Sequence, residues 1–140
     1  AAVAMWGEIS PILLPALTYS GDKYNINDVL DDVRCGESQV WIAVDDSTIY
    51  GAVVTQIVQY PRKLMLFVIC LAGKKFHLWD NIVKDCLVPY AKDNDCHGIE
   101  FLGRKGWIKR ASSLGFTPIH TVFEMAIKDD SYAEYAGYLQ

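Results

Sequence analysis

The chain has 140 residues, of which 51% are hydrophobic and 21% are charged, and its formal net charge is -4. This length and balance are typical of one folded domain, and they exclude a disordered chain or one too short to bury a core. We expect a soluble protein with no nucleic-acid or membrane partner, because a mildly acidic chain neutralises few phosphates and no apolar run reaches the ~18 residues of a membrane span.

Two short helices are predicted before the first strand. Ser10 and Pro11 indicate a helix start, with Ser10 as the cap and Pro11 in the first helical position, and Pro15 limits its length. A second helix fits Asn25 to Val33, where the apolar residues fall on one face. Gly36 is a suitable stop for this helix.

Three strands with short connections follow. They are predicted at Gln39 to Val44, Ile49 to Gln59 and Leu64 to Leu71, joined by turns at residues 45–48 and 60–63. Short turns between strands favour an antiparallel meander. The third strand is apolar on both faces, so we expect it to be central and covered on both sides.

The second half of the chain alternates helices and strands. Phe76 to Lys92 has a helical apolar period, and Pro89 should kink or close its last turns. Ile99 to Gly103 fits a short strand, and a helix between two strands favours a right-handed parallel crossover. Another helix fits Lys105 to Leu114 and ends at Gly115. Its inward-facing residues are predicted to be Trp107, Ile108, Ala111 and Leu114.

The last predicted strand lies within Thr117 to Ile127, with a break near Pro118. The order is then α-α-β-β-β-α-β-α-β. This order predicts an α/β sandwich with a mixed, mainly antiparallel central sheet. We expect residues 1–127 to form a single domain, followed by a tail at residues 128–140.

The four cysteines, Cys35, Cys70, Cys86 and Cys96, do not indicate a disulfide framework. Cys70 lies in a predicted strand and Cys86 in a predicted helix, so a reduced intracellular protein is expected. Cys96 precedes His97, but no second such pair follows. We therefore predict a polar loop there and no metal site.

Both the element order and the local sequence resemble the GNAT (N-acetyltransferase-like) superfamily. The stretch Ile99 to Arg104, followed by a helix and by the step Leu114-Gly115-Phe116, resembles the second half of a GNAT domain. Gly103 to Ile127 and the turn Tyr60 to Lys63 resemble GNAT-like proteins encoded by tailed bacteriophages. The resemblance covers about Met5 to Lys128. It implies a GNAT-like fold, acetyl-CoA as cofactor, transfer of an acetyl group to an amine, and a location in the host cytoplasm or in a virion.

The resemblance also implies where the cofactor binds. GNAT enzymes hold the cofactor pyrophosphate on backbone N–H groups between the central strand and the long helix, through a loop of roughly Arg/Gln-x-x-Gly-x-Gly/Ala. This slot reads Leu71-Ala72-Gly73-Lys74-Lys75-Phe76, with one glycine. It is either a degenerate CoA loop or a plain strand-to-helix turn with two solvated lysines.

A second basic cluster either supports the same anion or is a solvated helix face. It comprises Arg104, Lys105, Lys109 and Arg110. The candidate cofactor-binding residues are therefore Leu71, Ala72, Gly73, Lys74, Lys75, Phe76, Arg104 and Lys105.

Acetyl transfer requires an amine to lose a proton and a thiolate to gain one. The resemblance implies a Glu or a water for the first task and a Tyr for the second. Ala111 occupies the position of that Tyr, and the strand Leu64 to Leu71 carries no carboxylate. Catalytic residues are therefore left unassigned. Structural or solvated roles are expected for His77, Glu100, Ser112, Ser113 and His120. The rival hypotheses are a non-catalytic GNAT-fold binding or virion-associated module and an inhibitor of a host protein.

The tail carries tyrosines at every third position, namely Tyr132, Tyr135 and Tyr138. On a helix they would form an aromatic stripe, and tyrosine suits protein interfaces because it combines apolar area with a polar tip. We expect this stripe to dock on a protein partner. The alternatives are packing on the domain's own surface and a frayed terminus.

Overall fold

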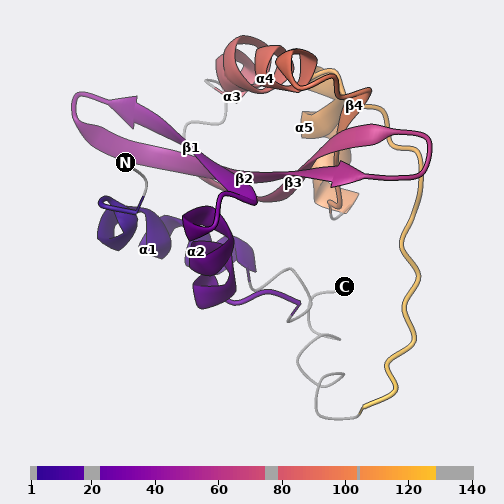
Figure 1. Ribbon diagram of the computed structural model, residues 1–140, viewed down its shortest axis with the longest axis horizontal. Helices are drawn as coiled ribbons and strands as arrows, with labels where there is room; N and C mark the ends of the chain where they lie inside the picture. Colours follow the sequence, from indigo (N-terminus) through magenta and orange to yellow (C-terminus); the bar gives the residue numbers. More distant parts are fainter. Residues whose placement is uncertain (1–2, 18–22, 75–78, 104, 129–140) are drawn as a thin grey trace.

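The computed structural model describes residues 3–17, 23–74, 79–103 and 105–128. Several predicted features lie outside these ranges, namely Lys75, Phe76, His77, Arg104, Tyr132, Tyr135 and Tyr138. In chain order the elements are α1 (Trp6–Leu17), α2 (Ile26–Arg34), β1 (Ser38–Asp45), β2 (Thr48–Gln59), β3 (Leu64–Gly73), α3 (Trp79–Ile82), η3 (Val83–Leu87), α4 (Val88–Asp93), β4 (Gly98–Phe101), η4 (Lys105–Trp107) and α5 (Ile108–Ser113) (Figure 1). None of the helices in the described ranges is long and apolar enough to cross a membrane.

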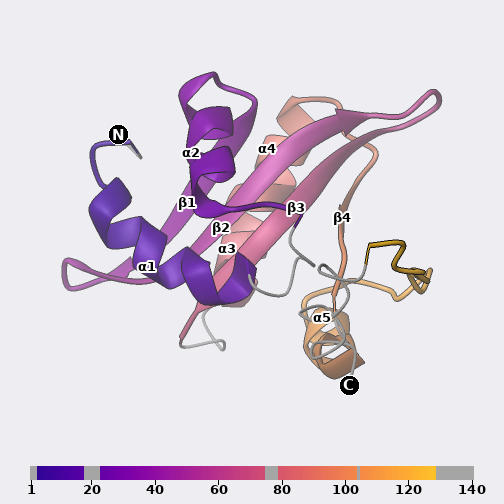
Figure 2. The same ribbon diagram turned by 90° about the horizontal axis from the view of Figure 1, so that it is seen from below.

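A four-stranded sheet in the order β1-β2-β3-β4 forms the centre of the fold. β1 pairs with β2 and β2 with β3 in antiparallel fashion, while β3 and β4 run parallel. The helices α1 and α2 cover one face, and α3 to α4 cover the other (Figures 1 and 2). The predicted meander, the parallel pair and the central position of β3 are all confirmed.

The core between α1, α2 and the sheet is built from residues spaced by one helical turn. Ile9, Leu13 and Leu17 lie four residues apart on α1, and all three are buried. They pack with Val29 of α2 and Val54 of β2. Each fully buried side chain of this size contributes about 1.5–3 kcal/mol, so this stripe holds α1 against the sheet.

A second core lies on the opposite face, below α3 to α4. Trp79 and Leu87 are each 1% exposed and pack with Val53 and Leu66, which are fully buried. Both faces of β3 are therefore covered, and its apolar sequence is explained.

β3 contains a β-bulge at Ile69. Val54 lies opposite Cys70 and Thr55 opposite Val68, which leaves Ile69 without a partner on β2. One extra residue reverses the face to which the following side chains point. Val68 accordingly packs in the core below α3 to α4, whereas Cys70 packs in the core below α1 and α2.

The ends of α2 are fixed locally: the stop at Gly36 was predicted, whereas the cap at Asn25, which was expected inside the helix, was not. The Asn25 side chain accepts a hydrogen bond from the Asp28 N–H (2.9 Å), and the Asp28 carboxylate accepts one from the Asn25 N–H (3.0 Å). This reciprocal capping box satisfies two N–H groups that the helix itself cannot. Gly36, at φ 84°, follows the helix in the left-handed conformation typical of such a stop.

The start of α1 differs from the prediction. The helix begins at Trp6, and both Pro11 and Pro15 lie inside it, so Ser10 does not cap it. A proline inside a helix removes a hydrogen bond and costs about 3 kcal/mol. Because the helix starts earlier than predicted, Ile9 lies on the same face as Leu13 and Leu17 and is fully buried. The burial of Ile9 offsets the cost of the prolines inside the helix.

The consecutive elements α3, η3 and α4 form one long helix, which Pro89 distorts but does not end. The segment η3 is a π-helical turn, in which the Val88 N–H donates to the Val83 carbonyl five residues earlier. A π-turn before a proline accommodates the missing N–H and the bulk of the ring. The helix then continues to Asp93.

The predicted strand at Thr117 to Ile127 is wrong for this structure. The described residues of this segment form no regular element, and the chain runs away from the sheet (Figure 1). Phe123 is 91% and Met125 83% exposed. The alternating sequence is typical of a strand, but a ladder also needs hydrogen bonds to a neighbouring strand, and this segment pairs with none of the described strands.

Candidate functional site

The two parallel strands part at the end of the sheet where β3 finishes. They pair only over Met65–Val68 and Gly98–Phe101. β3 continues to Gly73, whereas the chain leaves β4 towards η4 and α5 (Figure 2). The bulged residue Ile69 is the first one beyond the last pair. In open α/β sheets, ligands bind beyond the carboxyl ends of parallel strands, and bulges are frequent beside active sites.

Four residues of the predicted cofactor loop, Leu71 to Lys74, lie within the described ranges. Leu71 packs in the core below α3 to α4, and Ala72 in the core below α1 and α2. Gly73 has φ 142°, and a Cβ atom there would overlap the Tyr50 carbonyl oxygen. The Lys74 N–H donates to that same carbonyl (2.8 Å). Glycine at position 73 therefore allows β2 and β3 to approach each other closely. The Lys74 N–H is already hydrogen-bonded to β2.

Trp79 ties the start of the long helix to the end of β3. Its ring lies directly against Gly51, where a Cβ atom would be only 2.5 Å from a ring carbon. The indole Nε1 donates to the Lys74 carbonyl (3.3 Å). Gly51 and Trp79 thus hold the start of α3 against β2 and the end of β3, a pairing that sequence reasoning missed because the two residues are far apart in the chain.

Two exposed lysines of the predicted binding set lie at the same end of the sheet. Lys74 follows β3, and Lys105 begins η4 in the connection that follows β4. Lys74 lies six residues beyond Val68, where the pairing of β3 with β4 ends, and Lys105 lies four residues beyond Phe101. Both lysines therefore follow the carboxyl ends of the two paired segments.

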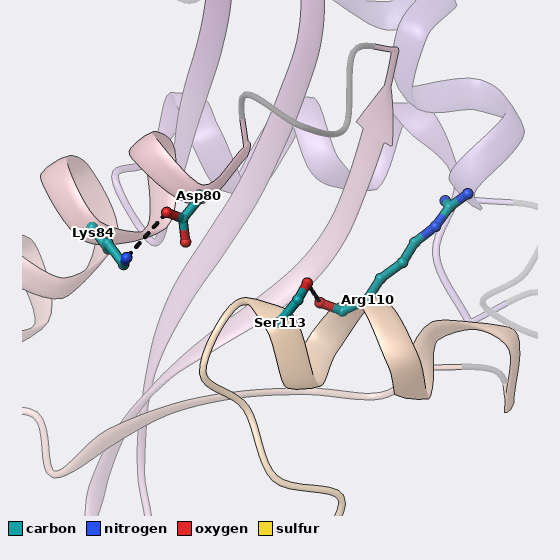
Figure 3. A network of polar contacts seen from close by, with 4 residues as sticks. All are labelled: Asp80, Lys84, Arg110 and Ser113. Carbon is teal, nitrogen blue, oxygen red and sulfur yellow. Dashed lines mark hydrogen bonds and ion pairs between the residues drawn. The ribbon is translucent and has the colours of Figure 1, made fainter.

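The charged side chains of the long helix and of α5 have different surroundings (Figure 3). Asp80, in the first turn of α3, pairs with Lys84 at 3.0 Å, so these two charges neutralise each other at the helix start. Arg110 extends from α5 away from that pair. The Ser113 hydroxyl donates to the Arg110 carbonyl (2.7 Å), which occupies it within its own helix.

An aromatic cluster holds α5 against β4. The Phe101 ring meets Trp107 edge-on at a centroid distance of 6.2 Å and Phe116 at 5.0 Å. Trp107 is therefore packed, as predicted, and Ala111 is buried at 8% exposure. The prediction for Ile108 is wrong, because it is 48% exposed. The six-residue α5 buries only one narrow face.

The remaining polar candidates mostly have structural partners. The Tyr60 hydroxyl donates to Glu100 at 2.6 Å, and this hydrogen bond, with smaller effects of desolvation and of the carboxylate charge, raises the pKa of Tyr60. His97 Nδ1 accepts from the Leu64 N–H at 3.1 Å. His120 is exposed in an irregular segment, so its expected place in a strand is wrong.

A pocket beside β4 was not predicted from the sequence. It has a volume of about 290 Å³. Its walls come from the long helix, from the start of β4 and from the turn after α5. The lining residues are Val83, Val88, Ala91, Lys92, Cys96, His97, Gly98, Ile99, Leu114, Gly115 and Phe116. Burial, followed by the charge of Asp95, raises the pKa of the Cys96 thiol. The expected polar loop at Cys96 is thus partly buried.

No protein-family model matches the sequence, and no curated protein matches it. Solved structures do match its fold. A probable acetyltransferase aligns with a TM-score of 0.71 at 12% identity, over 92% of this chain and 97% of its own. The BH1408 protein from Bacillus halodurans aligns at 0.69 with 19% identity over 91% and 97%. A predicted acetyltransferase with acetyl-CoA from Clostridium acetobutylicum aligns at 0.58 with 16% identity over 79% and 82%.

These neighbours and the mixed four-stranded sheet with flanking helices define a GNAT-like α/β fold. The fold class predicted from the sequence is confirmed. At these identities the likeness is one of fold alone.

Proposed function

We propose that the protein is a GNAT-like N-acetyltransferase that binds acetyl-CoA where β3 and β4 part. The observation that carries this proposal is the separation of the parallel strands immediately after Val68 and Phe101, with the bulged Ile69 at the opening. Lys74 and Lys105 supply positive charge for the cofactor phosphates. The Clostridium structure with acetyl-CoA supports the choice of cofactor at the level of the fold.

The chemistry is a transfer of the acetyl group from the thioester sulfur of acetyl-CoA to an amine nitrogen. A carbon–nitrogen bond forms, the carbon–sulfur bond breaks, the amine loses a proton and the released thiolate gains one. Ala111 offers no proton at the position where the resemblance implies a Tyr, so this chain's contribution is to orient the two reactants. Orientation alone supplies several kcal/mol of the barrier reduction. We expect the rate to follow the deprotonated fraction of the acceptor amine.

The test is calorimetric titration of the full chain with CoA and acetyl-CoA. Reversing both lysine charges, in Lys74→Glu with Lys105→Glu, should weaken binding at least about tenfold. Arg62→Glu with Lys63→Glu is the matched control, because it also reverses two positive charges, at the opposite end of β3, and should leave affinity unchanged. Absence of heat and of a thermal shift at millimolar cofactor would overturn the proposal, since a Kd of 1 mM already corresponds to about -4 kcal/mol.

A second candidate function is a non-catalytic GNAT-fold binding or virion-associated protein. Two observations favour it. The Lys74 N–H donates to the Tyr50 carbonyl within the sheet, and residue 111, where the resemblance implies a Tyr, is a buried alanine. Under this alternative the protein binds neither CoA nor acetyl-CoA, so the same titration separates the two candidates.

The phage resemblance of Gly103 to Ile127 supports an origin in a tailed bacteriophage, with the protein in the host cytoplasm or in the virion. Mass spectrometry of purified virions separates these two locations. The tyrosines Tyr132, Tyr135 and Tyr138 are proposed to dock on a protein partner. Deleting the residues after Ile127 should then reduce complex formation in light scattering, and unchanged assembly would contradict this.

A further inference from the structure

The segment from Thr117 to Ile127 has the pattern of a strand but no sheet to join. In a strand, every second residue from Ile119 to Ile127 would lie on one face, which is apolar apart from Thr121. Ile119 is 76%, Phe123 91% and Ile127 85% exposed. Contiguous apolar surface of this kind marks an interaction site, because leaving it in water is unfavourable.

The edge of the sheet at β4 has the complementary properties. β4 ends the strand order among the described residues, so its outer backbone groups face no further strand. Ile99 and Phe101 pack in the core below α3 to α4, whereas Glu100 between them bonds to Tyr60 at the opposite face. A strand added to this edge therefore needs one apolar and one polar face. The segment provides a strongly apolar face, while its other face is mixed, with His120 and Glu124 alternating with the smaller apolar residues Val122 and Ala126.

The apolar pocket beside β4 lies where the apolar face of such a strand would pack. Its walls include Val83, Val88 and Ala91 of the long helix and Ile99 of β4. A strand on the β4 edge would cover this pocket and bury side chains that are exposed at present. The donor segment thus offers an apolar face to an apolar pocket and its backbone groups to the outer edge of β4.

The chain geometry directs the segment away from its own sheet. The Phe116 N–H donates to the Ala111 carbonyl (2.9 Å) and its ring packs on Phe101, so the chain is anchored just before the segment. Pro118 then restricts Thr117 to extended conformations. From this anchor the segment leaves the body of the molecule (Figure 1). Fully extended, it spans about 36 Å, enough to lie along a neighbouring molecule.

We propose that Thr117 to Ile127 of one copy adds as a strand to the β4 edge of a second copy, and that the two copies exchange these segments reciprocally. Each copy carries one donor and one acceptor, so a two-fold exchange uses both and closes the assembly. The resulting dimer has a five-stranded sheet in each half, with the pocket beside β4 covered by the partner's segment.

The first test measures the mass of the full chain by sedimentation over a range of concentrations. A dimer is expected. Phe123→Asp should weaken the dimer about 100-fold, because it places a charge on the buried face at both exchanged sites. Its side chain is 91% exposed within one copy, so the fold of the monomer should survive, as checked by circular dichroism. His120→Asp is the control on the mixed face and should leave the dimer intact. A monomer at all concentrations, or a dimer insensitive to Phe123→Asp, overturns the proposal.

The second test separates exchange from closure within one chain. In a Cys35→Ser background, Ile119→Cys, Phe123→Cys and Met125→Cys are oxidised in turn to trap a disulfide with Cys96, which lines the pocket. At least one of these variants should give a covalent dimer on non-reducing gels. His120→Cys, on the other face, should not. A disulfide confined to single chains, or no dimer from any of the three, contradicts exchange between copies.

Discussion

Replacing Gly73 by alanine should destabilise the protein strongly, whether or not it binds a cofactor. The residue has φ 142°, a region that side chains other than glycine adopt at a cost of about 1–3 kcal/mol. The new methyl group would also overlap the Tyr50 carbonyl and the Gly51 backbone, which cannot rotate away as a side chain could. Forcing extra atoms into packed structure costs a further 1–3 kcal/mol or so. We expect a loss of about 2–6 kcal/mol in the free energy of unfolding.

Urea denaturation followed by tryptophan fluorescence measures this loss. Gly106→Ala is the matched control, because a Cβ atom there meets nothing within 4 Å and the residue has no positive φ. It should change stability by less than about 1 kcal/mol. If Gly73→Ala were as stable as the wild type, the close approach of β2 and β3 described above would be refuted.

This result also decides how the cofactor site is tested. A charged substitution at Gly73 would abolish binding by disrupting the contact between β2 and the end of β3, even if the glycine never touched a cofactor. Charge reversal at Lys74 and Lys105 avoids this difficulty, since both side chains are exposed.

The remaining predictions concern the core and the buried thiol. Leu13→Ala should lower the free energy of unfolding, measured by urea denaturation, by about 2–5 kcal/mol, because the side chain is fully buried. Leu14→Ala, at a position 48% exposed, should lower it by less than about 1 kcal/mol. Equal effects would contradict the orientation of α1. Burial raises the pKa of Cys70 to about 12, so at pH 8 Cys35 should be alkylated rapidly and Cys70 only after unfolding, as peptide mass spectrometry would show. Comparable labelling of both thiols in the native protein would show that β3 is not covered.

Sequence by itself determined the features whose causes lie within a few residues. The capping pair Asn25 and Asp28 acts across one helical turn, and Gly36 ends that helix through its own backbone freedom. Short turns force neighbouring strands to be antiparallel, and a strand that is apolar on both faces must be interior. The GNAT-like order followed from these local patterns.

Tertiary structure alone decided the features that depend on distant partners. Pro11 indicated a helix start, but burial of Ile9 against the sheet extended α1 beyond it. Gly73 matched a phosphate loop in sequence, yet its conformation is set by the close approach of β2. The bulge at Ile69 could not be predicted, because register depends on the facing strand.

The segment Thr117 to Ile127 illustrates the same limit. Its alternation specifies which side chains share a face, and the sequence determined that much. Whether such a segment becomes a strand depends on a free edge within reach, because backbone hydrogen bonds in a sheet are always made with another segment. Only the three-dimensional structure shows that no strand among the described residues pairs with the outer edge of β4 and that the apolar side chains of the segment are exposed.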